Sequence, residues 1–304
     1  MSASKPVRGL RLKLPATSAN LGPGFDAVGL AMSMHLTVEA HPAAVFQIAA
    51  TGRDAELCAA LENNLILDTY RLECGRHSVE AQPLRLTIHN EIPLGMGCGS
   101  SAAALLAGVA LARHFGELKM NDAELVAEAS RIEGHPDNVA ACWYGGFTVS
   151  AQSEAGVECA TFAGDPAWEM MLVLPQASLS TKKARALLPA TYSKEDAVFN
   201  VQRAALLVAA FAQGRMDLLR TAMQDRIHQP YREEACPLLK SLLPLASEKE
   251  IAGVALSGAG PSVLVFLHEG TTLLEAETRL RAAAGEEVEL LSLRIAEGVT
   301  ETLL

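Results

Sequence analysis

Residues 92–108, IPLGMGCGSSAAALLAG, constrain the fold of this chain more than any other stretch. Three glycines alternate through the loop, and two serines, Ser100 and Ser101, follow them at once. The unbroken run of small apolar residues at 102–112 then predicts a buried helix. A glycine-rich backbone can approach a ligand closely, and a serine-capped helix N-terminus offers N–H groups and a positive dipole to an anion. The stretch therefore predicts a phosphate-binding loop.

Two other interpretations of this loop stay open on the residues alone. The Walker pattern is absent because no lysine follows the glycines, but 97–102 fits the looser GxGxxA form of the dinucleotide fingerprint. That fingerprint opens directly off a buried parallel strand, whereas 84–89 alternates like a half-exposed strand and Asn90, Glu91 and Pro93 follow it. The other alternative is a glycine-rich turn that merely precedes a core helix.

The composition limits the class of protein. Half of the 304 residues are hydrophobic and 20% are charged, which supplies ample material for a core and favours two domains. A net charge of −10 without a dense Lys/Arg run argues against a nucleic-acid partner. Six scattered cysteines without a CxxC pair indicate reduced thiols, and we recognise neither a signal peptide nor a membrane-spanning run. We therefore expect a cytoplasmic protein that binds neither nucleic acid nor a membrane.

The N-terminal segment predicts a strand followed by a turn-rich stretch. Residues 7–13 alternate like a strand, and 15–24 consist largely of turn-forming types. Asn20 and Asp26 bring polar groups into otherwise small and apolar surroundings. A lone Asp at such a position is more commonly a turn or cap residue than a ligand.

Further elements are expected before and after the loop. Segment 44–51 is expected to be the hairpin partner of a strand at 35–40, and 55–74 to be one helix that closes on Gly75. The helix after the loop should end at Gly116.

The next helix carries a carboxylate in an unfavourable place. It begins at Asn121, with Glu124 three residues later as a capping box, and runs to Gly134. Glu133 lies in its last turn, where a negative charge faces the negative end of the helix dipole. A cationic partner would offset this cost, and plain exposure to water is the simpler alternative.

Residues 134–147 break that helix and bring three polar side chains, His135, Asp137 and Asn138, into a turn. An apolar run follows them, so we expect the turn to be buried. His135 would commonly be a core histidine bonded to backbone. Because no second histidine stands at metal-ligand spacing, it does not predict a histidine metal site.

The second half of the chain predicts an α+β sandwich of ferredoxin-like kind. A variable stretch comes first, and one of the helices should be capped by Ser180 and Thr181. The expected elements are a strand at 168–175, helices at about 195–212 and 215–225, a strand–turn–strand at 250–267, a helix at 272–283 and a last strand at 287–295.

Three separated motifs together resemble the signature motifs of the GHMP kinases. They are PATSANLGPGFDAVGLAM, PLGMGCGSSAAALLAG and LSGAGPSVLVF, and the resemblance covers nearly the whole chain. EGHPDNVAACWYGGF, STKKARALLP and DRIHQPYR look like the homoserine kinases of that superfamily, with Cys98 where the family usually has Leu. The resemblance implies a two-domain α+β fold. Residues 1–160 would be a ribosomal-S5-domain-2-like α/β domain that binds ATP, and 161–304 a ferredoxin-like domain.

The resemblance also implies how the chain binds ATP and Mg²⁺. Backbone N–H groups of the loop would wrap the triphosphate, and the third motif would close beside it. Ser101 and Glu133 would contact Mg²⁺, which would give Glu133 the cationic partner that its place on the helix requires. The implied ATP-binding residues are Asn64, Pro93, Leu94, Gly95, Met96, Gly97, Cys98, Gly99, Ser100, Ser101, Ala102, Ala103, Gly258 and Gly260.

The implied acceptor is L-homoserine, whose hydroxyl would take the γ-phosphoryl group of ATP to give O-phospho-L-homoserine for threonine biosynthesis. Asp26 accepts hydrogen bonds only when ionised, which suits an ammonium group. Arg185 and Arg232 would clamp the carboxylate, the planar task for which Arg is best shaped. The implied substrate-binding residues are Asn20, Asp26, His135, Asn138, Arg185 and Arg232.

The same resemblance assigns catalysis to Glu133, Asp137 and Asn138. Asp137 would act as a base, or Asn138 would position the hydroxyl without a dedicated base.

The rival functions are another GHMP kinase, acting on an isoprenoid such as mevalonate or on a sugar, a dinucleotide-binding oxidoreductase, and a non-catalytic anion-binding module. The oxidoreductase needs a ribose-binding acid about twenty residues after the glycines, for which Glu117 is the nearest candidate. Strand edges and superfamily habit suggest a homodimer.

Overall fold

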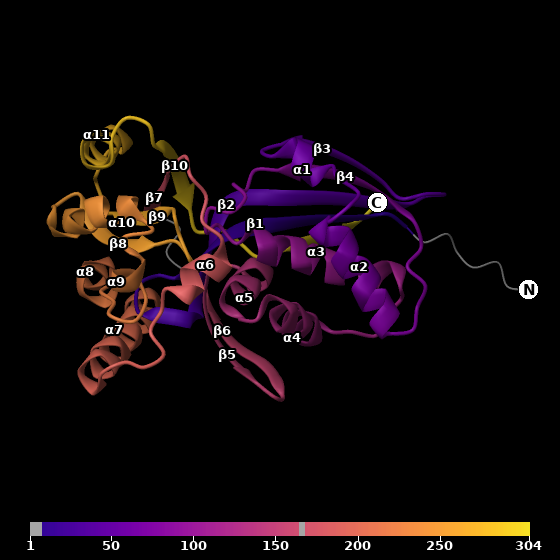
Figure 1. Cartoon of the computed structure of the whole chain (residues 1–304), viewed down its shortest axis with the longest axis horizontal. Helices are drawn as coiled ribbons and strands as arrows, with labels where there is room; N and C mark the ends of the chain where they lie inside the picture. Colours follow the sequence, from indigo (N-terminus) through magenta and orange to yellow (C-terminus); the bar gives the residue numbers. More distant parts are fainter. Residues whose placement is uncertain (1–7, 164–167) are drawn as a thin grey trace, which may run out of the picture.

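The chain folds into two sheets with helices packed on them, one after the other along the long axis (Figure 1). The computed structural model describes residues 8–163 and 168–304. Within these residues the first sheet has seven strands: β1 (Leu10–Asn20), β2 (Gly24–Pro42), β3 (Gln47–Gly52), β4 (Leu84–Asn90), β5 (Phe147–Ser153), β6 (Gly156–Phe162) and β11 (Thr300–Leu303). They are ordered β11-β1-β2-β4-β3, while β5 pairs with β2 and β6 with β5.

Strand β1 is longer than the sequence predicts, because turn-forming residues at its end pair with β2. Residues 16–19 lie opposite 29–32 and are almost completely buried. The expected turn at 15–24 is therefore wrong for its first half. Only 21–23 turn, with Leu21 at φ 45° and Gly22 at φ 88°. Strand pairing and burial outweigh the local preference of these residue types.

Four helices pack side by side over the first sheet: α2 (Leu65–Arg76), α3 (Ser100–Phe115), α4 (Asp122–Glu133) and α5 (Asp137–Tyr144). The buried helix predicted after the glycine loop is α3, in which every residue at 102–112 except Ala104 is buried. Its predicted end before Gly116 is confirmed. The predicted capping box of Asn121 and Glu124 opens α4.

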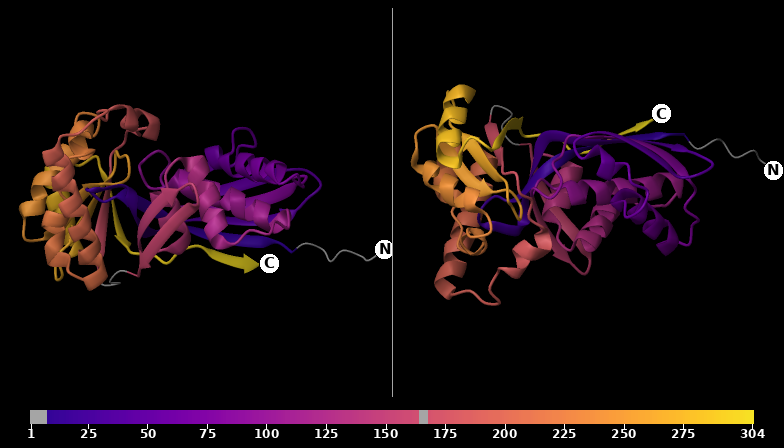
Figure 2. Two further views of the ribbon diagram at one scale, coloured as in Figure 1. Left: turned by 90° about the horizontal axis from the view of Figure 1, so that it is seen from below. Right: turned by 45° about the horizontal axis from the view of Figure 1, so that its top comes forward.

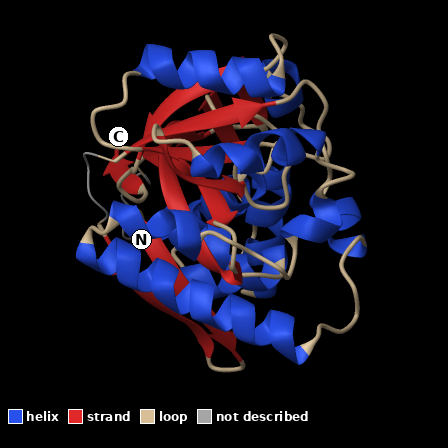
Figure 3. Cartoon of the chain, turned by 90° about the vertical axis from the view of Figure 1, so that its left-hand side faces the viewer, coloured by secondary structure: helices blue, strands red, loops and turns tan. Residues whose placement is uncertain are grey.

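Four strands form the second sheet: β7 (Glu169–Leu174), β8 (Ile251–Leu256), β9 (Val263–Leu267) and β10 (Glu289–Arg294). Their order, β10-β7-β9-β8 with antiparallel neighbours, is that of a ferredoxin-like fold and confirms this prediction. Helices cover both faces (Figure 3). They are α10 (Pro237–Leu242) and α11 (Leu273–Ala284) on one face, with α7 (Lys194–Gln213) and α8 (Leu219–Ala222) on the other.

The two sheets share a hydrophobic core. Phe147 of β5 stacks on Phe211 of α7 at a centroid distance of 3.9 Å, and Trp168 packs on the same ring at 4.9 Å. After β10 the chain returns to the first sheet, where β11 pairs antiparallel with β1 (Figure 2). The division into 1–160 and 161–304 stays a prediction, with the last residues lying in the first sheet.

Two predictions around the first sheet are wrong. The expected helix at 55–74 is broken into α1 (Ala55–Cys58) and α2, because Asn64 caps the start of α2 by accepting a hydrogen bond from the Leu67 amide at 3.3 Å. Strand β3 pairs in parallel with β4 instead of forming a hairpin with β2. Both sides of that part of β2 are already taken by β1 and β4.

Three further segments also differ from expectation. The predicted turn at 134–147 is short, and most of it is helix α5. The variable stretch at 151–166 contains the β5–β6 hairpin; its residues 164–166 lie outside the described residues. The helix expected at 215–225 is confined to a 3₁₀ turn and α8 at 216–222. Among the helices at 8–163 and 168–304, none is long and apolar enough to cross a membrane.

Candidate active site

A cavity of about 250 Å³ lies where the glycine loop, the turn between β1 and β2, and the start of α5 meet. A short helix, α6 (Thr181–Ala186), and the turn after β8 close it from the side of the second sheet. Its predicted lining residues are Asn20, Asp26, Gly95, Gly97, Cys98, Gly99, Ser100, Ser101, Glu133, His135, Asp137, Asn138, Arg185, Arg232 and Gly258.

The glycine loop is held in a conformation that suits glycine. Gly95, Gly97 and Gly99 have φ angles of 70°, 75° and 68°, in the left-handed region. Ser257 Oγ donates to the Gly97 carbonyl at 2.8 Å, and a Cβ on Gly97 would lie 2.2 Å from the Ser257 carbonyl oxygen. The backbone of the third motif therefore fixes the loop by close contact.

The start of α3 departs from the prediction of a serine cap. The N-cap residue is Gly99, which has no side chain to satisfy the helix N–H groups. The first-turn N–H groups of α3 thus face the cavity region without a side-chain cap, and an anion can accept from them. Ser101 uses its hydroxyl differently, by donating to Glu133 Oε2 at 2.7 Å.

Replacing Gly99 by alanine is expected to disturb this site through a defined clash. A Cβ there would lie 1.8 Å from Thr17 Oγ1, which is buried and donates to Asn138 Oδ1 at 2.8 Å. Losing that buried hydrogen bond should lower kcat about tenfold. Alanine in this left-handed backbone conformation should also lower the free energy of unfolding by about 1–2 kcal/mol. Gly214→Ala is the matched control, since Gly214 has φ 64° and no described atom within 4 Å of its Cβ position. Equal losses of activity in the two variants would contradict this role of Thr17.

Glu133 and Ser101 meet because the end of α4 lies against the start of α3. The local sequence could not predict this contact. In it the hydroxyl donates to the carboxylate and offsets the unfavourable interaction of Glu133 with the dipole of α4. A hydroxyl and a carboxylate oxygen at the edge of the glycine loop are hard ligands of the kind that Mg²⁺ accepts. The residues present therefore fit a magnesium ion.

A second polar group is fixed at the start of α5. His135 Nδ1 lies 2.6 Å from Asp137 Oδ1, which also accepts from the Asn138 amide at 2.7 Å and its Nδ2 at 3.3 Å. Burial lowers the pKa of His135, but the hydrogen bond and charge of Asp137 outweigh burial and raise it overall. His135 is thus bonded to a carboxylate in the cavity, and not to backbone as the sequence suggested.

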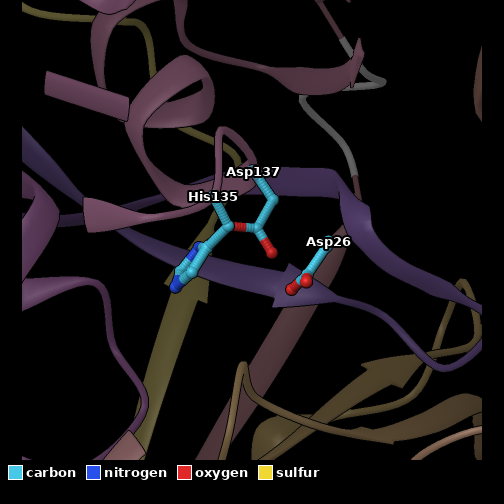
Figure 4. A group of neighbouring side chains, drawn as sticks. All are labelled: Asp26, His135 and Asp137. Carbon is cyan, nitrogen blue, oxygen red and sulfur yellow. The ribbon is translucent and has the colours of Figure 1, made fainter. Parts of the chain in front are cut away.

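Asp26 faces this pair across the cavity (Figure 4). The ligand atoms of Asp26, His135 and Asp137 lie within 4.8 Å of one another, which a metal could use. Each already has a protein partner, however, because Arg185 binds Asp26 and His135 binds Asp137. The arrangement is therefore better described as a set of paired polar side chains that line the cavity.

Opposite charges converge at the far end of the cavity. Arg185 donates to both oxygens of Asp26, at 2.9 and 2.5 Å, and this bond raises the pKa of Arg185. Arg232 is 1% exposed, and burial lowers its pKa, as does the nearby charge of Arg185. The Phe25 ring lies 5.4 Å from one guanidinium carbon and 5.7 Å from the other. Asn20 connects this end to the third motif by donating to the Gly258 carbonyl at 2.8 Å.

A larger and more apolar cavity of about 510 Å³ adjoins the first at Ser100 and Ser101. It is lined by the α1–α2 connection, β4 and the start of α3, and includes Asn64 and Leu94. The Asn64 side chain donates to the carbonyls at positions 58 and 60, at 3.1 and 3.0 Å, so it shapes this wall. Ser100 and Ser101, at the start of α3, thus line both the apolar cavity and the charged one.

The remaining predicted ATP residues, Pro93, Met96, Ala102, Ala103 and Gly260, line neither of these two cavities. Ala102 and Ala103 are completely buried in α3. Cys98 is also buried, and burial raises its pKa to about 12, which leaves it a protonated, unreactive thiol.

Sequence reasoning missed Thr17, Phe25 and Ser257, which contact the predicted residues. All three stand in the first and third motifs. The signal that could have found Thr17 and Ser257 is a hydroxyl side chain within a segment of small residues.

The comparisons with known proteins agree with this geometry. Residues 64–146 match the family model "GHMP kinases N terminal domain" and 207–286 match "GHMP kinases C terminal". The homoserine kinase of Solibacter usitatus is 47% identical over 94% of this chain and 95% of its own length. That of Deinococcus radiodurans is 40% identical over 86% of each. The crystal structure of homoserine kinase from Cytophaga hutchinsonii has the same fold, with a TM-score of 0.79, 24% identity and 99% coverage of both chains.

The alternative of a dinucleotide-binding oxidoreductase is wrong. The loop does not open off a strand, since residues 91–99 separate β4 from α3. The match to a family of kinases contradicts the oxidoreductase directly, and it also contradicts the non-catalytic anion-binding module. The chain belongs to the GHMP kinase superfamily and, within it, to the ATP-dependent homoserine kinases of threonine biosynthesis.

Proposed function

We propose that the chain transfers the γ-phosphoryl group of ATP to the side-chain hydroxyl of L-homoserine, giving O-phospho-L-homoserine. The observation that carries the proposal is the carboxylate of Asp26 facing the guanidinium groups of Arg185 and Arg232 in a small cavity. An α-amino acid presents an ammonium and a carboxylate on one carbon, which matches this set of charges. Mevalonate and sugars lack that pair.

ATP would lie across both cavities. The base would occupy the apolar chamber beside Asn64 and Leu94, and the triphosphate would follow the loop at 93–101. Backbone N–H groups at the start of α3 support this orientation, because they favour phosphate oxygens. Gly258 and Gly260, which belong to the third motif, would lie beside the glycine loop and close it against the triphosphate.

Ser101 and Glu133 would hold Mg²⁺ beside the phosphates, because their hydroxyl and carboxylate oxygen atoms lie close together and are ligands that Mg²⁺ accepts. When bound, the ion neutralises charge on the transferring phosphoryl group. The protein's own contribution is to orient the reacting groups, which dominates catalysis of phosphoryl transfer.

The acceptor would be held at its charged end by Asn20, Asp26, Arg185 and Arg232, with its hydroxyl toward the start of α5. There Asn138 is fixed from both sides, since its Oδ1 accepts from Thr17 and its Nδ2 donates to Asp137. An amide held in this way can position the hydroxyl in line with the γ-phosphate.

Asp137 is assigned a positioning role, because its Oδ1 is already used by His135 and Asn138. Asp137→Asn is expected to lower kcat about tenfold, the effect of weakening one charge-assisted hydrogen bond. The shape of the pH–rate profile should not change. A general base would instead be worth about 10²–10⁴-fold in kcat. A loss of that size together with a lost acidic limb would assign proton abstraction to Asp137.

A coupled assay of ADP release with homoserine, mevalonate, galactose and shikimate tests the acceptor directly. We expect turnover with homoserine only. Turnover with mevalonate or galactose and none with homoserine would overturn the proposal. The homodimer and the cytoplasmic location stay predictions.

A further inference from the structure

His228 is a completely buried histidine that the proposed mechanism does not use. It precedes α9 (Gln229–Arg232), in the DRIHQPYR segment, and stands one helical turn before Arg232. Both of its ring nitrogens have partners. Nε2 lies 2.7 Å from the Gly22 carbonyl oxygen, and Nδ1 lies 3.0 Å from Arg232 Nη1.

These two partners determine where the ring proton is. A guanidinium can only donate and a carbonyl oxygen can only accept, so Nδ1 accepts from Arg232 and Nε2–H donates to Gly22. The ring is therefore neutral, with its proton on Nε2. Burial lowers the pKa of His228 and favours this neutral form, against the opposing effect of the Asp225 carboxylate.

The bond to His228 is the shortest of the hydrogen bonds that orient Arg232. The other two are longer: Nη1 donates to the Gly258 carbonyl at 3.4 Å and Nε to the Ala184 carbonyl at 3.3 Å. A guanidinium with five donors needs such fixed acceptors to keep one edge turned toward a ligand. Removing the imidazole acceptor would leave the orientation of Arg232 to two weak bonds.

His228 also joins Arg232 to the part of the site that faces it. Gly22 lies in the turn between Asn20 and Asp26, and the Phe25 ring packs on His228 at a centroid distance of 5.5 Å. One imidazole thereby connects the turn of the first motif with the arginine of α9, two segments that come from opposite halves of the chain.

We propose that His228 is a positioning residue for the acceptor's carboxylate, which sets the orientation of Arg232 and its distance from the Asp26 turn. It touches neither ATP nor the reacting hydroxyl. The inference rests on the proposed function, in which Arg232 binds that carboxylate.

The test compares His228→Leu with His228→Gln, whose carboxamide can accept from Arg232 and donate to Gly22. His228→Leu should raise the KM for homoserine about 10- to 100-fold, the effect of losing a hydrogen bond to a charged group. The KM for ATP and kcat should change less than about threefold, and His228→Gln should restore most of the affinity. If the leucine variant does not fold, His228→Phe replaces it, because its ring is similar in shape but offers no acceptor to Arg232.

Two controls separate positioning from general destabilisation. Leu219→Ala removes a fully buried side chain of α8 that makes no polar contact with Arg232, and should lower the melting temperature without raising the KM for homoserine. The inhibition constant of 3-aminopropanol, which is homoserine without its carboxylate, should be the same in wild type and in the His228 variants.

An equal rise of both KM values, or a glutamine variant as impaired as the leucine variant, would overturn the inference. Weaker inhibition by 3-aminopropanol in the His228 variants would do the same. A wild-type enzyme that does not phosphorylate homoserine at all would instead overturn the proposed function, so the two failures are distinguishable.

Discussion

Glu133→Gln is expected to lower kcat with homoserine by about 10³-fold while leaving the fold intact. The amide can still accept the hydrogen bond from Ser101 but carries no charge for a divalent cation. Metal-assisted charge stabilisation is worth several kcal/mol in a transition state, which corresponds to about this factor in rate. Glu133 lies at the C-terminal end of α4, where loss of a negative charge should slightly stabilise the helix.

The measurements are kcat as a function of Mg²⁺ concentration, melting temperature, and Mn²⁺ binding by electron paramagnetic resonance in the presence of ATP. Glu128→Gln is the matched control, since it removes a carboxylate from the same helix whose ion pairs, with Arg76 and Arg131, lie outside both cavities. The control should bind Mn²⁺ like the wild type. Near-normal activity of Glu133→Gln at saturating Mg²⁺ would remove Glu133 from the metal site.

The sequence was sufficient for elements whose signals are local. The small apolar run of α3 and the capping box of α4 lie within single helices, and the end of α3 and the start of α4 agree with the prediction. The order of elements in the second half was enough to indicate a ferredoxin-like sheet. Prediction failed where a distant partner decides the conformation. Residues 16–19 look like a turn and become a buried strand only because β2 pairs with them.

The site is harder to predict because its contacts join distant parts of the chain. Ser101 and Glu133 are 32 residues apart, and Asp26 and Arg185 are 159 apart. Local rules described Glu133 as misplaced and Asp26 as a turn residue, which are correct descriptions of their surroundings in sequence. The chemical roles of Glu133 and Asp26 depend on which side chains the fold places next to them. The resemblance to a family was needed to predict these roles.

The Asp26–Arg185 pair gives a specific reason for selecting a zwitterion. In the structure the two side chains neutralise each other through two hydrogen bonds, and they are only partly buried. A ligand that inserts one charge would separate the pair and leave its other member with water as its only new partner, which forfeits the attraction within the pair. In the proposed complex an amino acid would supply a new partner to each: its ammonium to Asp26 and its carboxylate to Arg185. The internal pair would then be exchanged for two substrate pairs, and charge balance would be kept.

Arg185→Ala is accordingly expected to raise the KM for homoserine about 10- to 100-fold, because a charge-assisted bond to the carboxylate is lost and Asp26 is left without its protein partner. The KM for ATP should stay within about twofold, since Arg185 does not line the apolar cavity proposed for the base of ATP. Lys182→Ala is the control, an exposed cation on the same short helix.

Two truncated inhibitors resolve the pairing further. Arg185→Ala should weaken 4-hydroxybutanoate, which keeps only the carboxylate, and Asp26→Asn should weaken 3-aminopropanol, which keeps only the ammonium. A rise of equal size in the KM values of homoserine and ATP would contradict the exchange, because it would mean that Arg185 supports the cavity as a whole and not the charge of one substrate.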